Sequence, residues 1–227
     1  MTKIKSYKEK GGKRVDKNVS WFIDKQVEKV IKSLEKNNMK GIYVKDEDEL
    51  LEVIQNLIEE KSVVGVGDSA TLQQTGILDL LRRGNYTFLD KYREGITSEE
   101  KKNLYLQNFS ADTFMSSANA LTEDGKLYNI DGNGNRVAPI IYGPKQVIIV
   151  VGINKLVRNE EDAEKRVRNY VAPIDAKRLN KDTPCTKLGY CVDCNSPNRI
   201  CNTFVTITGQ FAKERIKVVI VGKSLGY

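Results

Sequence analysis

The segment VVGVGDSATLQQTG, residues 63–76, begins with an apolar run that contains Gly65 and Gly67 and continues into several helix-capping residues. The apolar run is typical of a buried strand, and the polar residues after it can cap a following helix. Free backbone N–H groups at such a turn attract anions, although a full GxGxxG and a Walker lysine are missing. A capped turn without a ligand therefore stays open as the alternative. The residues that would contact a ligand are Gly65, Gly67, Asp68, Ser69 and Thr71.

Strand-like and helix-like segments alternate through the rest of the chain. Helical spacing is clearest at 17–40 and 50–58, and residues 121–137 indicate a hairpin or turn-rich insertion. This alternation predicts an α/β fold with a mainly parallel sheet, helices on both faces and an N-terminal helical extension. The remaining strands are expected at 42–44, 63–67, 86–89, 113–116, 147–151, 204–207 and 216–221.

The length of 227 residues fits one large domain, which we expect at 17–227, including a four-cysteine segment at 183–203. Most of the net charge of +7 lies near the N-terminus, where residues 1–16 form a basic arm that we expect to be flexible. A lysine-rich arm of this kind is more typical of a solvated segment than of a nucleic-acid-binding one. We therefore expect no nucleic-acid partner.

No apolar run approaches the roughly 20 residues that a membrane-spanning helix needs, and the N-terminus has no apolar signal-peptide region. We expect a cytoplasmic protein with no membrane partner. The chain contains no histidine, which excludes Ser-His-Asp triads, Cys-His pairs and histidine-ligated zinc. A general base must then be a carboxylate, Lys, Tyr or Cys.

A second candidate site is the polar segment SSANALTEDGKLYNIDGNGNRVAPIIYGP, residues 116–144. It follows a predicted parallel strand, where open α/β sheets bind their ligands. We expect catalytic roles for the carboxylates of Glu123, Asp124 and Asp131. Tight turns alone are the alternative, and the calcium interpretation lacks the spacing of an EF-hand. The ligand-binding residues expected here and after the strand at 147–151 are Asn119, Asn135, Arg136, Asn154 and Lys155.

All four cysteines of the chain lie between residues 185 and 201, with the spacing C-x5-C-x2-C-x6-C. Disulfides are disfavoured in a reducing compartment and in a chain of this size. The cysteines can therefore form a metal site, form a thiol redox centre or have no special role. If they bind a metal, thiolate ligands suit zinc and a 4Fe–4S cluster equally. The candidate ligands are Cys185, Cys191, Cys194 and Cys201.

Several long phrases, among them ANALTEDGKLYNIDGNGNRVAP, AEKRVRNYVAPIDAKRL and TPCTKLGYCVDC, resemble the LUD-domain family, formerly DUF162. The chain is similar to its short, stand-alone, cysteine-bearing type. The resemblance implies a fold like that of NagB, ribose-5-phosphate isomerase and the CoA transferases. It also implies a role in lactate utilisation, from L-lactate to pyruvate, with iron–sulphur proteins as partners. In that superfamily a Gly/Ser/Thr loop holds phosphate, and the resemblance assigns this role to Gly67, Ser69 and Thr71. Carboxylates after a central strand carry out catalysis there, and the corresponding residues here are Glu123, Asp124 and Asp131.

We therefore expect a protein of lactate metabolism that binds a small anionic organic acid, with a metal or Fe–S cluster at the cysteines. One alternative is an accessory electron-transfer or interaction subunit with a four-cysteine site. The other is an isomerase or transferase that binds a phosphorylated ligand unrelated to lactate. Whether the protein is an enzyme stays open at this point, because a shared fold does not confer a shared reaction.

Overall fold

The structure is a computed structural model that describes residues 16–227. The basic arm predicted at 1–16 lies outside the described residues, apart from Asp16. Asp16 caps the first helix, because its side chain accepts hydrogen bonds from the backbone N–H groups of Asn18 and Val19.

The centre of the molecule is a six-stranded sheet in which every neighbouring pair of strands is parallel. Its strand order is β1-β10-β7-β4-β2-β3. The predicted parallel α/β architecture is confirmed. The strands are β1 (Lys40–Val44), β2 (Val63–Val66), β3 (Thr87–Phe88), β4 (Thr113–Ser116), β7 (Gln146–Gly152) and β10 (Ile216–Val221).

Alternate residues of the central strand β7 enter two separate hydrophobic cores, because successive side chains of a strand point to opposite faces. Val147, Ile149 and Val151 pack on the side of helix α1 (Lys17–Lys36) and the second sheet. Ile148 and Val150 pack on the opposite side, against helices α2 (Glu47–Leu57), α3 (Ala70–Gln74) and α4 (Ile77–Arg83). Helices therefore cover both faces of the sheet, as predicted.

Helix α1 is buried only along its C-terminal half. Val27, Val30 and Leu34 are fully buried, whereas Trp21 and Phe22 are 61% and 54% exposed. The apolar spacing at 17–40 correctly predicted the helix.

A second sheet of four strands, in the order β8-β5-β6-β9, packs beside the first. The predicted hairpin supplies β5 (Ala120–Thr122) and β6 (Leu127–Asp131), which pair antiparallel. The strand predicted at 204–207 is β9 (Thr203–Ile207), and it extends this second sheet by pairing antiparallel with β6. The short β8 (Leu156–Val157) completes the sheet at the other edge.

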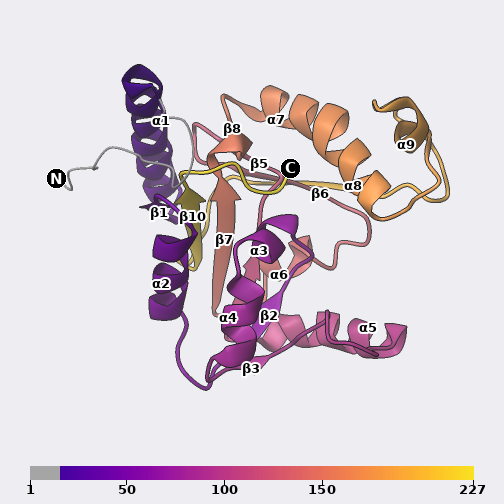
Figure 1. The fold of residues 1–227 in the computed structure, drawn as a ribbon, viewed down its shortest axis with the longest axis horizontal. Coiled ribbons are helices and arrows are strands. Elements are labelled where there is room, and N and C mark those ends of the chain that lie inside the picture. Colours follow the sequence, from indigo (N-terminus) through magenta and orange to yellow (C-terminus); the bar gives the residue numbers. More distant parts are fainter. Residues whose placement is uncertain (1–15) are drawn as a thin grey trace.

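Helices α7 (Glu160–Arg166) and α8 (Ala172–Arg178) cross the second sheet, and a π-helical turn at 167–171 joins them (Figure 1). Ala163 and Val167 pack against Ala120 and Tyr128 of that sheet. The sequence pattern did not predict this pair. The remaining helices are α5 (Ser98–Gln107), α6 (Val137–Ile141) and α9 (Pro184–Leu188). No helix within residues 16–227 is long and apolar enough to cross a membrane.

Candidate functional site

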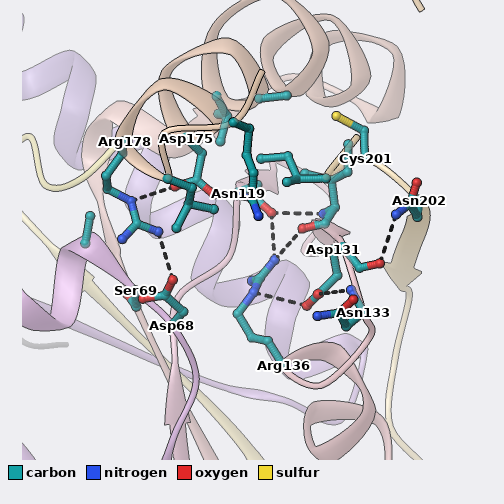
Figure 2. Close-up of a pocket in the computed structure, with 18 of the residues that line it drawn as sticks. Asp68, Ser69, Asn119, Asp131, Asn133, Arg136, Asp175, Arg178, Cys201 and Asn202 are labelled. Atoms are coloured by element: carbon teal, nitrogen blue, oxygen red, sulfur yellow. Dashed lines mark hydrogen bonds and ion pairs between the residues drawn. The ribbon is translucent and has the colours of Figure 1, made fainter. Parts of the chain in front are cut away.

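A cavity of about 480 Å³ opens where the parallel strands end. The strands β10, β7, β4 and β2 are neighbours, and the segment after each of them contributes to the lining. This is the edge at which open parallel α/β sheets bind ligands. Figure 2 shows residues of the second sheet and of α8 facing the same space. The four segments contribute Tyr227, Lys155, the stretch 117–119, and Asp68 with Ser69.

Lys155 is the buried amine of this cavity. Its residue is 3% exposed, and its Nζ atom donates to Oγ1 of Thr71 and to Oγ of Ser117, both at 2.9 Å. Within the described residues it forms no ion pair with a carboxylate. Burial lowers its pKa to about 7, and the positive charges of Arg166 and Arg136 act in the same direction. An amine that titrates near neutral pH can accept a proton, bind an anion or act as a nucleophile.

The C-terminal residues cover Lys155. Asn154 anchors this segment because its Oδ1 atom accepts the N–H of Leu225 at 2.9 Å, and Gln74 accepts the N–H of Gly226 at 2.7 Å. A side chain at Gly226 would begin 3.3 Å from Nζ of Lys155. The predicted ligand residue Asn154 does not line the cavity, whereas Lys155 does. Asn154 therefore positions the C-terminal segment that covers Lys155, and Lys155 itself faces the cavity.

Arg136 lines the cavity, but the two Nη groups of its guanidinium group already donate two hydrogen bonds each. Its side chain is only 11% exposed, and four of its hydrogen bonds are between 2.7 and 3.1 Å long. It therefore holds the hairpin onto the end of β4, and its Nη groups have no N–H left for a ligand. The acceptors are the carbonyl oxygens of Ser117 and Ile130 and Oδ1 of Asn119 and Asn129. Nε forms an ion pair with Oδ2 of Asp131 at 3.5 Å, and this oxygen accepts no hydrogen bond from a described residue.

Asp131 lies at the end of β6 and shapes the turn that follows it. Its Oδ1 atom accepts the backbone N–H groups of Asn133 and Gly134, at 3.3 and 3.1 Å. Figure 2 shows Asp131, Asn133 and Arg136 together along one side of the cavity. Asn119, Asn135 and Asp131 all line the cavity, as the polar segment predicted.

Asp68 forms a polar cluster on the opposite side of the cavity. It accepts hydrogen bonds from the hydroxyl of Tyr92 at 2.9 Å and from Arg178 at 2.8 Å, and Arg178 also bonds to Asp175 at 2.8 Å. Burial acts to raise the pKa of Asp68, but nearby Lys91, Arg178 and Tyr92 outweigh it and the pKa is lowered. Asp68 is therefore a stable anion and a weak base. Lys91 is itself buried, which lowers its pKa to about 8.

The two glycines of the opening segment serve packing. A Cβ at Gly65 would lie 2.1 Å from Oδ1 of Asn108, and one at Gly67 would lie 2.8 Å from Cγ of Arg136. Neither glycine lines the cavity. Ser69 lines it and caps α3 by accepting the N–H of Leu72 at 3.2 Å.

Glu123 and Asp124 lie at the tip of the β5–β6 hairpin and do not line the cavity. Glu123 pairs with Lys29 of α1 at 2.5 Å, and Asp124 accepts from Thr122 at 2.5 Å and pairs with Lys126 at 3.1 Å. The structure thus separates these two predicted catalytic carboxylates from the third, Asp131. Their contacts fix the hairpin to the first helix.

The four cysteines border one small void of about 20 Å³ next to the large cavity, and Cys201 lines both. Arg199 folds the segment around this void, since it donates to the carbonyl oxygens of Cys194 and Cys201 and to Asp193. All four thiols are free and partly buried, and burial raises the pKa of Cys201 to about 11. Within residues 16–227 no three His, Cys, Asp or Glu side chains already stand in a metal-binding arrangement.

Several lining residues escaped the sequence analysis because nothing local marks them. Asp175 and Arg178 come from α8, a helix that the sequence pattern did not predict, and Tyr227 comes from the end of the chain. Ser117 had a usable signal, because it directly follows a buried parallel strand.

The fold and the cavity define an α/β protein with a polar site at the carboxyl edge of a parallel sheet. The LUD domain family matches residues 27–221, and the chain belongs to this family. The predicted family is thereby confirmed.

Among solved structures, the chain is similar to a DUF162 family protein from Deinococcus radiodurans. The identity is 13%, the TM-score is 0.46, and the match covers 89% of this chain and 98% of that one. No curated protein matches the chain.

Proposed function

We propose that the protein binds a small carboxylic acid of lactate metabolism, of the 2-hydroxy or 2-oxo acid class, in the cavity around Lys155. The LUD-domain family is associated with lactate utilisation in general. The observation that carries the proposal is the position of Lys155, a buried amine that faces the cavity without a carboxylate partner among the described residues. A buried cation is normally paired, and a bound carboxylate supplies the missing partner.

The other charged residues of the cavity lining support the binding of an anionic ligand. Five basic side chains and three acidic ones border the cavity. The acidic groups are already bound to arginines or to backbone N–H groups, so they do not neutralise Lys155. The volume of about 480 Å³ exceeds that of a three-carbon acid, which leaves room for ordered water or a second molecule. The charged lining residues are Arg136, Lys155, Arg178, Lys181 and Arg199, with Asp68, Asp131 and Asp175.

If the protein turns the acid over, Lys155 is the proton acceptor we propose. Its pKa of about 7 suits a general base at neutral pH. Asp68 has a lowered pKa, and Asp131 uses one carboxylate oxygen in a turn and the other beside Arg136. The acid–base role first assigned to Glu123 and Asp124 would require them to reach a cavity that they do not line.

A thermal-shift series tests the proposal, because a ligand of the folded state raises its melting temperature. L-lactate and pyruvate are compared with ribose 5-phosphate and acetyl-CoA, in the wild type and in K155M. The exposed Lys145, whose side chain is 83% exposed, supplies the control variant K145M. We expect the two acids to stabilise the wild type and K145M but not K155M. Stabilisation by the phosphorylated ligands alone would favour an isomerase or transferase unrelated to lactate.

We also propose that the four cysteines bind a metal, which would give the protein a structural or electron-transferring centre beside the acid site. The supporting observation is that all four thiols border a single void. The N–H of Asp193 already points to Sγ of Cys191 at 3.3 Å, a contact that also stabilises a thiolate. A void of about 20 Å³ has room for one water-sized sphere, which suits a single zinc ion. A 4Fe–4S cluster would require the segment to open.

Iron, sulphide and zinc analysis of anaerobically purified protein tests this second proposal. Stoichiometric zinc without colour indicates a single ion, whereas stoichiometric iron and sulphide with visible absorbance indicates a cluster. The cluster result would also support exchange of electrons with iron–sulphur partner proteins. Freshly reduced protein that contains neither metal would contradict a metal site.

A further inference from the structure

The two hydroxyl groups beside Lys155 define the direction of its reactive electron pair. Nζ donates to Thr71 and to Ser117, both at 2.9 Å. A neutral amine has two N–H bonds and one lone pair in a tetrahedral arrangement, so these two contacts use both N–H bonds. Gly226 packs on the same amine, and a Cβ there would lie 3.3 Å from Nζ. No described residue other than these two hydroxyls is hydrogen-bonded to Nζ, and Lys155 lines the cavity.

Near neutral pH part of this amine is in the neutral form, which is the form that reacts with a carbonyl group, because burial lowers its pKa to about 7. Both neighbours are neutral hydroxyls, and no described carboxylate forms an ion pair with Lys155. The positive charges of Arg166 and Arg136 also act against the ammonium form. A lysine amine in a desolvated, cation-rich pocket is the setting in which carbonyl compounds form imines in proteins.

We propose that Lys155 forms a covalent imine with the carbonyl group of a small 2-oxo acid. This proposal rests on the proposed function and narrows its ligand to an acid with a carbonyl next to the carboxylate. The Nζ lone pair adds to the carbonyl carbon, the carbon–oxygen π pair moves to oxygen, and one N–H proton passes to that oxygen. The hydroxyl group of this intermediate then takes one proton from solvent and leaves as water, and the product is a protonated C=N bond. Ser117 and Thr71 are close enough to relay the proton.

When the carbonyl carbon of the acid reacts with Lys155, the ligand carboxylate has other partners in the lining in place of the Lys155 ammonium. Asn119 accepts hydrogen bonds through Oδ1 from Ile130 and Arg136, so no described residue occupies its Nδ2 donor. Arg178 uses Nε and one Nη on Asp175 and Asp68, and its other Nη is bonded to no described residue. Figure 2 shows Asn119 and Arg178 facing the same space from different elements. One amide and one guanidinium group thus remain to orient the acid toward Lys155.

Reductive trapping tests the proposal. The full chain is incubated with pyruvate and cyanoborohydride, which converts an imine into a stable secondary amine. Intact mass spectrometry counts the adducts, and peptide mapping locates them. L-lactate is the matched control ligand because it has a hydroxyl in place of the carbonyl. K155R is the matched variant because it keeps the positive charge and cannot form the imine, and K145R is its exposed control.

We expect one reduced pyruvyl adduct on Lys155, formed in the wild type and in K145R, competed by L-lactate and absent from K155R. If K155R fails to fold, the peptide map of the wild type still identifies the modified lysine. Pyruvate that raises the melting temperature but leaves Lys155 unmodified would overturn the imine and keep the proposed function. Modification of other lysines alone would also overturn it. Failure of both acids to bind would overturn both proposals.

Discussion

Nζ of Lys155 lies 2.9 Å from Oγ of Ser117, a contact that joins the ends of the neighbouring strands β7 and β4. The two residues are 38 positions apart in the chain. The parallel pairing of the strands brings their carboxyl ends together, and each strand contributes the polar residue that follows it. The contact places a titrating amine at the floor of the cavity.

The burial of Lys155 makes the stability of the fold depend on pH. Its pKa is about 7 in the folded protein and about 10.4 in an unfolded chain, so between these values the unfolded state binds more protons. The free energy of unfolding should therefore rise from pH 7 to pH 8, by about 1 kcal/mol from this group. Urea unfolding should show a smaller rise in K155M and an unchanged one in K145M. The same rise in the free energy of unfolding with pH in the wild type and in K155M would mean that Lys155 does not titrate in this range.

Replacing Arg136 should disrupt the cavity wall. R136M leaves four acceptors without this donor and Asp131 without its ion-pair partner, and we expect the free energy of unfolding to fall by about 3–5 kcal/mol. Arg158 provides the control, since its side chain is 82% exposed and its ion pair with Asp162 is 3.4 Å long. R158M should change stability by less than about 0.5 kcal/mol. Similar effects of the two substitutions would refute the supporting role of Arg136.

The glycine after β2 should tolerate no side chain. G67A would place Cβ 2.7 Å from Oγ of Ser116 and 2.8 Å from Cγ of Arg136, so we expect a loss of about 1–3 kcal/mol of stability. Gly132 is the matched control because the nearest atom to its Cβ would be 3.4 Å away, an ordinary contact. Thermal unfolding compares G67A with G132A. A wild-type melting temperature for G67A would show that Arg136 can move aside.

The double variant E123Q/D124N tests whether the hairpin tip contributes to ligand binding in the cavity. Both carboxylates pair with surface lysines outside the lining, so binding of L-lactate should persist with an affinity close to that of the wild type. Calorimetry measures this affinity. A large loss of L-lactate affinity in a folded double variant would show that these carboxylates take part in ligand binding.

The parallel sheet was predictable from the sequence because its signals are local. The buried run at 63–66, the capping residues after it and the apolar strand at 147–151 each determine one element, and both strands were found. The hairpin at 121–137 was predicted for the same reason. The second sheet was not, because the pairing of β6 with β9 joins residues far apart in the chain. No local pattern reports such pairing.

The candidate site was predictable in part. The segments after β2, β4 and β7 were expected to contain ligand residues, and Asp68, Asn119 and Lys155 do line the cavity. Whether a polar side chain is free for a ligand depends on its partners, which the sequence does not show. Arg136 is the clearest example, because both of its Nη groups already donate two hydrogen bonds each within the fold. Arg178 and Tyr227 reach the cavity only through tertiary packing.

A calorimetric titration of L-lactate into the wild type and K155M at pH 6.5 and 8.5 tests the central claim most directly. We predict a saturable site whose affinity falls from pH 6.5 to 8.5, because the Lys155 ammonium that pairs with the carboxylate loses its proton over this range. K155M should weaken binding by at least about tenfold, or about 1.4 kcal/mol, while K145M should not. Equal affinity in the wild type and K155M, or no binding to the wild type, would contradict a carboxylic acid site at Lys155.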